Sequence, residues 1–286
     1  MSGPEFVTFH SDRPVDDAGA HPNANLGAGE YMRMIDMLFR SVRLFHRHAR
    51  CTLLTDAATR VNGVRGRWRR SVHEVDYRRL MLSRTRAQHD YVSAHDFRCP
   101  LALIDSDILV NGSLGSLCDQ DFDVALTVRP SKRMPINGGL IILNNRRPDR
   151  SRAFVRRLLE IYETRFTDDA QWYGDQLALV ACLDRPVREL SEAAPVTVGD
   201  VRVLLLPCET FNFSSDADPR AIERPLPDKR ILHFKGPRKP LMPLYWAAHL
   251  RPREFAFPFR WYPRAIGARA IRDAIARQAV ALTAPQ

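Results

Sequence analysis

Blocks of hydrophobic residues alternate along the chain between two spacings, one typical of buried strands and one typical of helices. The runs "FVTF" at residues 6–9 and "CTLLTD" at 51–56 are short and continuous, so we expect buried strands there. Between them, residues 34–45 place an apolar side chain at every third or fourth position, which predicts a helix. Residues 15–29 are rich in Gly, Ala, Asn and Asp and predict a loop. This order of strand, loop, helix and strand predicts an α/β protein.

The same two patterns continue to about residue 240. Helical spacing recurs at 77–95 and at 152–166, and the segment "WYGDQLALVACL" has the form of a further helix. The remaining expected strands are "PLALIDSDILV", "DVALTV", "GLIILNN", "VRVLLLP" and "RILHFKG". Because strands and helices alternate, we expect a mixed, mostly parallel central sheet flanked by helices.

The composition changes near residue 250, where aromatic residues and prolines are followed by a helix rich in Ala and Arg. Ile271, Ile275 and Leu282 fall near one face of that helix, and its arginines fall elsewhere. A basic helix of this kind can lie on an anionic membrane surface. The alternative is a C-terminal helix that docks on the domain and keeps its arginines in water.

Composition otherwise places the chain among ordinary globular proteins. Its 286 residues, 45% hydrophobic and 27% charged, are enough for one large domain with a substantial core. No window reaches the ~18 continuous apolar residues of a membrane-spanning helix, and the first residues lack the pattern of a secretion signal. The five cysteines are scattered and form no CxxC pair, which disfavours a zinc or disulfide framework. We therefore expect a cytoplasmic protein.

The chain is strongly basic, with a formal net charge of +10 and a pI near 9.8. This balance suits nucleic acid, an anionic membrane or a small anionic substrate as partner. The excess is mostly dispersed arginine, which more often forms a solvated surface than a binding patch. Only "VRGRWRR" at 64–70 and the C-terminal tail approach the mixture of clustered cations and aromatic residues expected of nucleic-acid binding. Charge alone does not choose among these partners.

Two carboxylates stand in the most hydrophobic part of the chain, in "PLALIDSDILVNGSL". An uncompensated buried carboxylate is costly, so Asp105 and Asp107 need a partner. Residues i and i+2 of a strand project to the same side, so both carboxylates are expected to converge on one point. Ligands of open α/β sheets bind beyond the carboxyl ends of the strands, and two carboxylates there suit Mn²⁺ or Mg²⁺. The alternative is a pair of aspartates that bond loop amides at a strand end.

Three further segments carry candidate chemistry. In "HFKGPRKP", His233 can bind a metal and Lys239 a phosphate, or the segment is a turn with a surface lysine. In "PINGGLIILNN", two glycines before a strand allow a ligand to approach Asn137, or they form a tight turn. In "WYGDQLAL", Asp175 and Gln176 stand at a helix N-terminus, where they face a substrate or where Asp175 simply caps the helix.

The order of these segments is more specific than any one of them. A DxD on a strand is followed by Asn-Gly-Gly, by Gly-Asp-Gln, by "LP…FNF" and by HxxGxxKP. This order resembles that of the GT-A-fold glycosyltransferases, in particular the retaining family 8, the glycogenin- and lipopolysaccharide-galactosyltransferase-like group. The resemblance runs from about Phe6 to Pro240 and implies a catalytic GT-A domain at 1–250, with a basic tail at 251–286. The chain departs from the pattern at Gly138, where the family often has Ala or Ser, and at Leu241, where it usually has Trp.

The resemblance implies a metal and diphosphate site. Asp105, Asp107 and His233 match the residues that hold the divalent ion, Mn²⁺ or Mg²⁺, in the family. Gly236 and Lys239 match the residues that contact the donor diphosphate.

The resemblance also implies contacts to the rest of the donor. Asp175 and Gln176 match a pair beside the reacting face of the sugar and are the expected catalytic residues. An arginine upstream of the DxD often contacts the donor, and Arg84 and Arg86 are both available here. The other implied positions are Thr8 at the base, Ser106 near the ribose, and Asn137 and Gly138 at the sugar or acceptor.

The expected function is metal-dependent transfer of a sugar from a nucleotide diphosphate, by family default a UDP-sugar, to a glycan or lipid-linked acceptor with retention. A membrane contact through the tail would place the protein at the inner membrane face. The alternatives are a sugar nucleotidyltransferase and a basic nucleic-acid-binding protein. The first usually has a Gly-rich loop after its first strand, and "FVTFHSDRP" contains no such loop.

Overall fold

The computed structural model describes residues 3–12, 28–131, 134–167, 173–184, 196–255 and 261–283. Its main sheet has eight strands in the order β3-β2-β1-β4-β7-β6-β9-β8, and only β7 and β8 run against the other six. A separate ribbon pairs β5 with β10 in antiparallel fashion. The strands are β1 (Glu5–Phe9), β2 (Cys51–Thr55), β3 (Arg69–Val72), β4 (Leu101–Ile104), β5 (Ile108–Val110), β6 (Val124–Val128), β7 (Ile136–Leu143), β8 (Val196–Val198), β9 (Val201–Pro207) and β10 (Ile231–His233). The expected mixed, mostly parallel sheet is confirmed.

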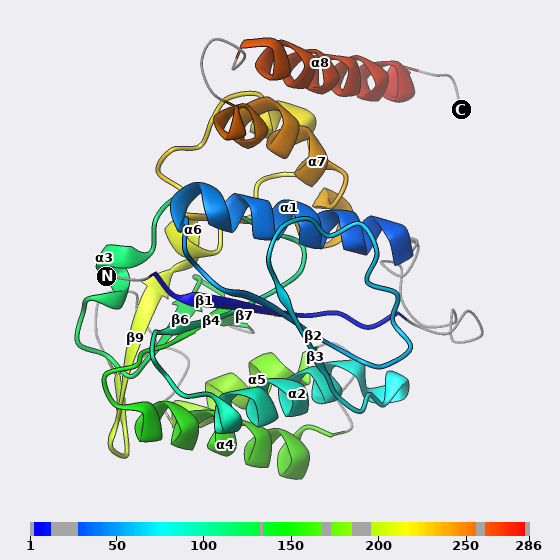
Figure 1. Cartoon of the computed structure of the whole chain (residues 1–286). Coiled ribbons are helices and arrows are strands. Elements are labelled where there is room, and N and C mark those ends of the chain that lie inside the picture. Colours follow the sequence, from blue (N-terminus) through cyan, green and yellow to red (C-terminus); the bar gives the residue numbers. More distant parts are fainter. Residues whose placement is uncertain are drawn as a thin grey trace.

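Helices cover both faces of this sheet. The helices are α1 (Ala28–Phe45), α2 (Leu80–Ala94), α3 (Gly115–Cys118), α4 (Pro148–Arg165), α5 (Gly174–Cys182), α6 (Cys208–Phe211), α7 (Leu241–Tyr245) and α8 (Trp261–Thr283), with a π-helical turn η6 (Trp246–Leu250) after α7. Figure 1 shows α1 on one face and α2, α4 and α5 on the other. Each face has its own apolar core, one built around Phe39 and Phe6 under α1 and the other around Phe154 and Leu82 under α2 and α4.

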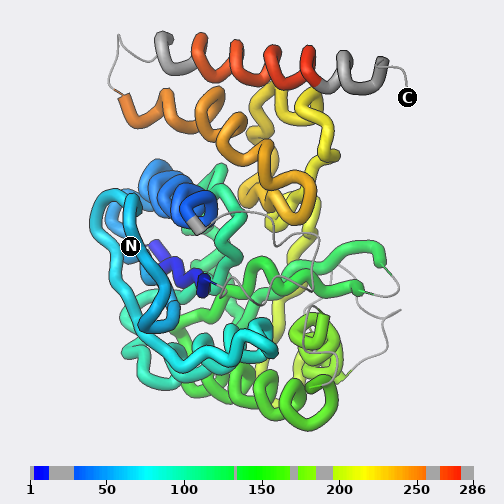
Figure 2. Tube along the Cα trace, turned by 90° about the vertical axis from the view of Figure 1, so that its right-hand side faces the viewer, coloured from blue at the N-terminus to red at the C-terminus, as the bar shows by residue number. Residues whose placement is uncertain are grey.

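A third apolar layer lies outside α1, where α7, η6 and α8 stack in turn (Figure 2). Ile271 of α8 is buried and Ile275 packs beside it, as expected for a docked helix. Gly267 lies against the backbone of η6, since a Cβ there would sit 2.3 Å from the Cα of Ala248. The side chain of Leu282 lies outside the described residues. The division into a domain at 1–250 and a tail at 251–286 stays a prediction.

The strand expected through the two central aspartates is interrupted, which corrects the sequence interpretation. β4 ends at Ile104, and the chain turns at Asp105 and Ser106. β5 then starts at Ile108 and pairs with β10 in the separate two-stranded ribbon. The two carboxylates therefore do not converge through the pleat of one strand. They meet because the turn changes the direction of the chain between two sheets.

The glycine segment also differs from its prediction. Asn137 and the two glycines after it lie inside β7, which begins at Ile136, and not in a turn before it. The register of β6 and β7 shifts between Leu126, which pairs with Ile141, and Thr127, which pairs with Asn137. The two glycines between these positions of β7 therefore have no register partner in β6. The sequence pattern did not predict β3, because its "RRSV" is polar and largely exposed at the sheet edge. The expected loop at 15–29 falls almost wholly outside the described residues.

Within the described part of the chain, none of the helices has both the length and the apolar character needed to cross a membrane.

Candidate functional site

A cavity of about 590 Å³ opens at the carboxyl ends of β1 and β4, beside the ribbon of β5 and β10. It brings together all but one of the site residues predicted from the sequence. Thr8 is the exception: it is completely buried in β1, and the residues that follow it, Phe9 to Asp12, line the cavity instead. The predicted residues in the wall are Asp105, Ser106, Asp107, Asn137, Gly138, Asp175, Gln176, His233, Gly236 and Lys239.

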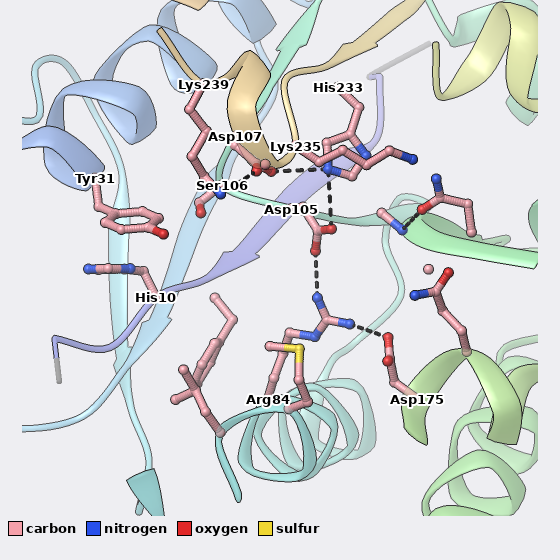
Figure 3. Close-up of a pocket in the computed structure, with 18 of the residues that line it drawn as sticks. His10, Tyr31, Arg84, Asp105, Ser106, Asp107, Asp175, His233, Lys235 and Lys239 are labelled. Atoms are coloured by element: carbon pink, nitrogen blue, oxygen red, sulfur yellow. Dashed lines mark hydrogen bonds and ion pairs between the residues drawn. The ribbon is translucent and has the colours of Figure 1, made fainter. Parts of the chain in front are cut away.

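Asp105, Asp107 and His233 lie at the centre of this wall (Figure 3). One ligand atom from each can be chosen so that all lie within 4.8 Å of one another. Nε2 of His233 is 3.1 Å from Oδ1 of Asp107 and 3.7 Å from Oδ2 of Asp105. Two carboxylates and an imidazole are a donor set that suits Mn²⁺ and other divalent ions. The residues present therefore fit the expected metal.

Asp107 is ionised in this setting. Burial by itself raises the pKa of its carboxyl, but His233 and Lys239 outweigh burial and hold the pKa well below its usual range. Nζ of Lys239 lies 3.2 Å from Oδ2 of Asp107. A carboxylate that stays charged at neutral pH is available as a metal ligand.

A chain of buried hydrogen bonds fixes the His233 ring. Its Nδ1 lies 2.8 Å from Oδ1 of Asn212, and Nδ2 of Asn212 donates to Oγ1 of Thr127 at 2.8 Å. The Thr127 hydroxyl donates in turn to the carbonyl of Asn137, at the irregular step between β6 and β7. Gly139 leaves room for the ring, because a Cβ there would lie 2.6 Å from Cε1 of His233. The ladder irregularity and the glycine together aim Nε2 at the two aspartates.

Arg84 of α2 connects the candidate metal-binding residues to Asp175, one of the two predicted catalytic residues. Its Nη1 donates to Oδ1 of Asp105 at 2.6 Å and its Nη2 to Oδ2 of Asp175 at 2.5 Å. Arg86, the other arginine considered from the sequence, instead pairs with Glu163 on the surface. Of these two arginines, Arg84 lines the cavity and Arg86 does not.

Asp175 has an unusual environment at the start of α5. Burial raises the pKa of its carboxyl, and Arg84 opposes this effect. Its Oδ1 is buried and has no hydrogen-bond partner among the described residues. It does not cap the helix: Tyr173 occupies the N-cap position without a side-chain bond, which corrects the simple capping interpretation. Gln176 follows it in the wall, with Oε1 3.5 Å from Nη2 of Arg129.

Three further cations line the cavity and were not predicted as site residues: Arg129, Lys235 and Arg238. Burial lowers the pKa of Lys235, and repulsion from Arg129 and Arg238 lowers it further. Lys235 and Arg238 stand at the variable positions of the HxxGxxKP motif, so the motif itself carried no signal for them.

An aromatic pair lies at the opposite side of the cavity. The rings of His10 and Tyr31 stack with centroids 4.7 Å apart, as Figure 3 shows, and Nε2 of His10 lies 3.0 Å from Oδ1 of Asp12. The sequence placed the base-binding region loosely at the end of the first strand, which is where His10 lies. Tyr31 comes from α1, and the helical spacing of its segment did not indicate that it would line the cavity.

No family model and no curated protein matches this chain. Among solved structures, it is similar to the glycosyltransferase GlyE of Streptococcus pneumoniae TIGR4, with 16% identity and a TM-score of 0.49 over 98% of this chain and 64% of that one. It is also similar to a glycosyltransferase involved in glycosylation of the major capsid of PBCV-1, with 12% identity, a TM-score of 0.48, and 84% and 98% of the two chains covered. A third is galactosyltransferase LgtC in complex with donor and acceptor sugar analogs, with 16% identity, a TM-score of 0.48, and 96% and 95% covered. The chain thus spans slightly less than two thirds of the length of GlyE.

Proposed function

We propose that the protein is a metal-dependent glycosyltransferase that moves a sugar from a nucleotide diphosphate, a UDP-sugar, to a glycan or lipid-linked acceptor with retention. The observation that carries this proposal is the convergence of Asp105, Asp107 and His233 from two sheets at the wall of one cavity. Lys239 and Asp175 flank this cluster on either side, the first beside Asp107 and the second across Arg84. A candidate cation site next to both a lysine and a buried carboxylate suits the charge that develops during transfer from a nucleotide sugar.

The three metal-binding candidates would hold Mn²⁺ or Mg²⁺. Lewis-acid stabilisation of the departing diphosphate is the chemistry that such an ion supplies when bound. Lys239 adds a positive charge on the side of Asp107, where the diphosphate would lie. The backbone of Gly236, which has a φ of 61°, allows the loop before Lys239 to turn toward that group.

The remaining wall supports a consistent position for the donor. The base would lie at the His10 and Tyr31 side, and the sugar would lie toward Asn137, Asp175 and Gln176. The unpartnered Oδ1 of Asp175 is available to a sugar hydroxyl or to the positive charge that develops at the reacting carbon. Arg84 keeps this carboxylate oriented by holding its other oxygen.

The test is calorimetry with a panel of UDP-, GDP- and CDP-sugars, with and without Mn²⁺. We expect Mn²⁺-dependent binding of a UDP-sugar, followed by slow hydrolysis whose first product retains the anomeric configuration of the donor. Asp105→Asn combined with Asp107→Asn should abolish both binding and hydrolysis. A matched control is Asp149→Asn with Asp184→Asn, whose side chains are 98% and 84% exposed. Absence of metal-dependent affinity across the whole panel would refute the proposal, and pyrophosphate-dependent exchange would favour a nucleotidyltransferase.

The membrane part of the proposal rests on α8. Arg269, Arg272 and Arg277 are exposed there, beside an Ile266 that is 51% exposed. These residues would face an anionic bilayer. The triple change of the arginines to Gln should release the protein from vesicles that contain phosphatidylserine, and it leaves the packed Ile271 intact. Equal sedimentation of both proteins with such vesicles, or no sedimentation of either, contradicts a membrane contact through this helix.

A further inference from the structure

The cations that line the cavity fall into two groups. Arg84 is paired with Asp105 and Asp175, and Lys239 is paired with Asp107. Arg129, Lys235 and Arg238 form no ion pair with a carboxylate among the described residues. Arg129 donates to the carbonyl of Met134 at 2.7 Å, and Arg238 donates to that of Ser215, so both are held in place by neutral groups. Arg129 and Arg238 are therefore fixed, and together with Lys235 they form a group of like charges without a counter-ion from the described part of the protein.

Binding of the nucleotide-sugar donor and its metal ion would not neutralise the excess of positive charge that these three cations give the cavity. Among the described residues, five cationic and four anionic side chains line the cavity, the fourth anion being Asp12 beside His10. A divalent ion and the diphosphate of a nucleotide sugar carry equal and opposite charge. Loading the site with both therefore leaves the positive excess unchanged. It remains where the carboxylates are absent, at Arg129, Lys235 and Arg238.

The position of this cluster separates it from the diphosphate. Figure 3 shows Lys239 directed to Asp107, whereas Lys235 extends past His233, away from Tyr31. The three cations are half-buried, while the side chain of His233 is only 4% exposed. Nη2 of Arg129 lies 3.5 Å from Oε1 of Gln176, which we place beside the reacting face of the sugar. The cluster therefore flanks the side of the cavity where we place the donor sugar, which is the group that an acceptor must reach.

We propose that Arg129, Lys235 and Arg238 form a second anion subsite that binds a phosphate or carboxylate carried by the acceptor. This inference rests on the proposed function, because only a transferase has an acceptor. Two planar guanidinium groups and an ammonium group suit the several oxygens of such an anion. An anionic group held there orients the acceptor and raises its occupancy over that of a neutral sugar.

Calorimetry on the protein loaded with Mn²⁺ and UDP tests the subsite. The probes are glucose 6-phosphate, glucuronate and neutral methyl glucoside. We expect one or both anionic sugars to bind at least about tenfold more tightly than methyl glucoside, and the phosphate and carboxylate arms identify the preferred anion. Arg129→Gln combined with Lys235→Met should remove this preference and change the affinity for UDP by less than about threefold. Arg98→Gln with Arg156→Gln, which removes two cations that are 83% and 67% exposed, should keep the preference.

Three results would overturn the subsite. The first is equal affinity of the loaded wild-type protein for all three sugars. The second is displacement of UDP by glucose 6-phosphate and glucuronate, which would assign the cluster to the diphosphate. The third is a preference for UDP-glucuronate over UDP-glucose that the double variant abolishes, which would assign the anion to the donor. Failure of the wild-type protein to bind UDP with Mn²⁺ would be a different result, because it removes the proposed function itself.

Discussion

Asn212 accepts a hydrogen bond from Nδ1 of His233 at 2.8 Å, and both side chains are buried. An amide oxygen can only accept, so Nδ1 carries a proton, and Nε2 is the ring nitrogen that faces Asp105 and Asp107. The same amide donates through Nδ2 to Thr127, which fixes its orientation. Asn212 thus keeps Nδ1 protonated and orients the ring of a candidate metal ligand.

Substitutions at Asn212 should show how much its bond to His233 contributes to metal binding, apart from its bond to Thr127. We expect Asn212→Leu to weaken Mn²⁺ binding by about 10- to 100-fold, because the His233 ring loses its orienting partner. Asn212→Asp should bind Mn²⁺ at least as well as the wild type, because its carboxylate still accepts from Nδ1. Electron paramagnetic resonance of free Mn²⁺ measures both affinities. Thr127→Val removes the bond from Nδ2 of Asn212 and the bond to the carbonyl of Asn137 but leaves the bond to His233, so it is the control for lost stability. If Asn212→Asp and Asn212→Leu weaken binding equally, Asn212 is structural only.

Gly139→Ala should damage the metal site through sterics alone. The new Cβ would lie 2.6 Å from Cε1 and 2.7 Å from Nδ1 of His233, so the buried ring must move. We expect a loss of about 1–3 kcal/mol in the free energy of unfolding and weaker Mn²⁺ binding. Urea denaturation and Mn²⁺ titration measure the two effects. Gly29→Ala is the matched control, because a methyl group at this position in the first turn of α1 would meet no atom within 4 Å. Unchanged Mn²⁺ affinity in Gly139→Ala would contradict the steric explanation.

Arg84→Gln should be strongly destabilising. Arg84 neutralises Asp105 and Asp175, and its side chain is 12% exposed. Removal leaves two carboxylates without their counter-ion, which we expect to cost about 3–5 kcal/mol in unfolding free energy. Asp175→Asn in the same chain should recover part of this loss, and a double-mutant cycle by urea denaturation measures the coupling. Arg86→Gln breaks a surface pair with Glu163 and should cost less than about 1 kcal/mol. Equal losses for Arg84→Gln and Arg86→Gln would show that the buried pairing is not needed.

Stability should fall in acid because of Glu5, which starts β1 at the end of the sheet opposite the cavity. Burial raises the pKa of its carboxyl, but bonds from His95, Tyr91 and Thr52 and the charge of Arg50 outweigh it and lower the pKa to about 2. Because the folded pKa lies below the ordinary value of 4.5, the stabilisation is complete above that value and is lost as pH falls toward 2. The contribution at neutral pH is about 3 kcal/mol.

Urea denaturation of the wild type and of Glu5→Gln between pH 2 and 7 checks this contribution. The variant should be less stable at neutral pH and should lose less stability on acidification. Parallel pH profiles of the two proteins would exclude Glu5 as the source. Metal binding at neutral pH should be the same in the folded fraction of both proteins, because Glu5 does not line the cavity.

The sequence predicted much of the scaffold, because apolar periodicity reflects burial directly. The strand at 6–9 and the helix through 34–45 are present, whereas the arginine-rich β3 was missed because an exposed edge strand has no apolar pattern. The sequence identified the candidate metal-binding residues, but it did not predict how they are arranged in space. A spacing of two between Asp105 and Asp107 is compatible with one pleated strand, and only tertiary structure reveals the turn between them. Asn212 stands within the "FNF" segment of the sequence pattern, but its contact with His233, like that of Arg129 with Gln176, joins distant segments, and local patterns do not encode such contacts.

The break between β4 and β5 has a consequence for the synthesis of the protein. All eight strands of the main sheet lie before residue 208, whereas His233 arrives with β10, the strand that pairs with β5. A nascent chain that has emerged as far as β9 already contains every strand of the main sheet. Of the candidate metal site, it contains only Asp105 and Asp107. His233, the third residue of the candidate metal site, is therefore made after every strand of the main sheet. The segment that supplies the strands of the main sheet thus precedes the segment that completes the candidate metal site, so a chain truncated after β9 would have the first without the second.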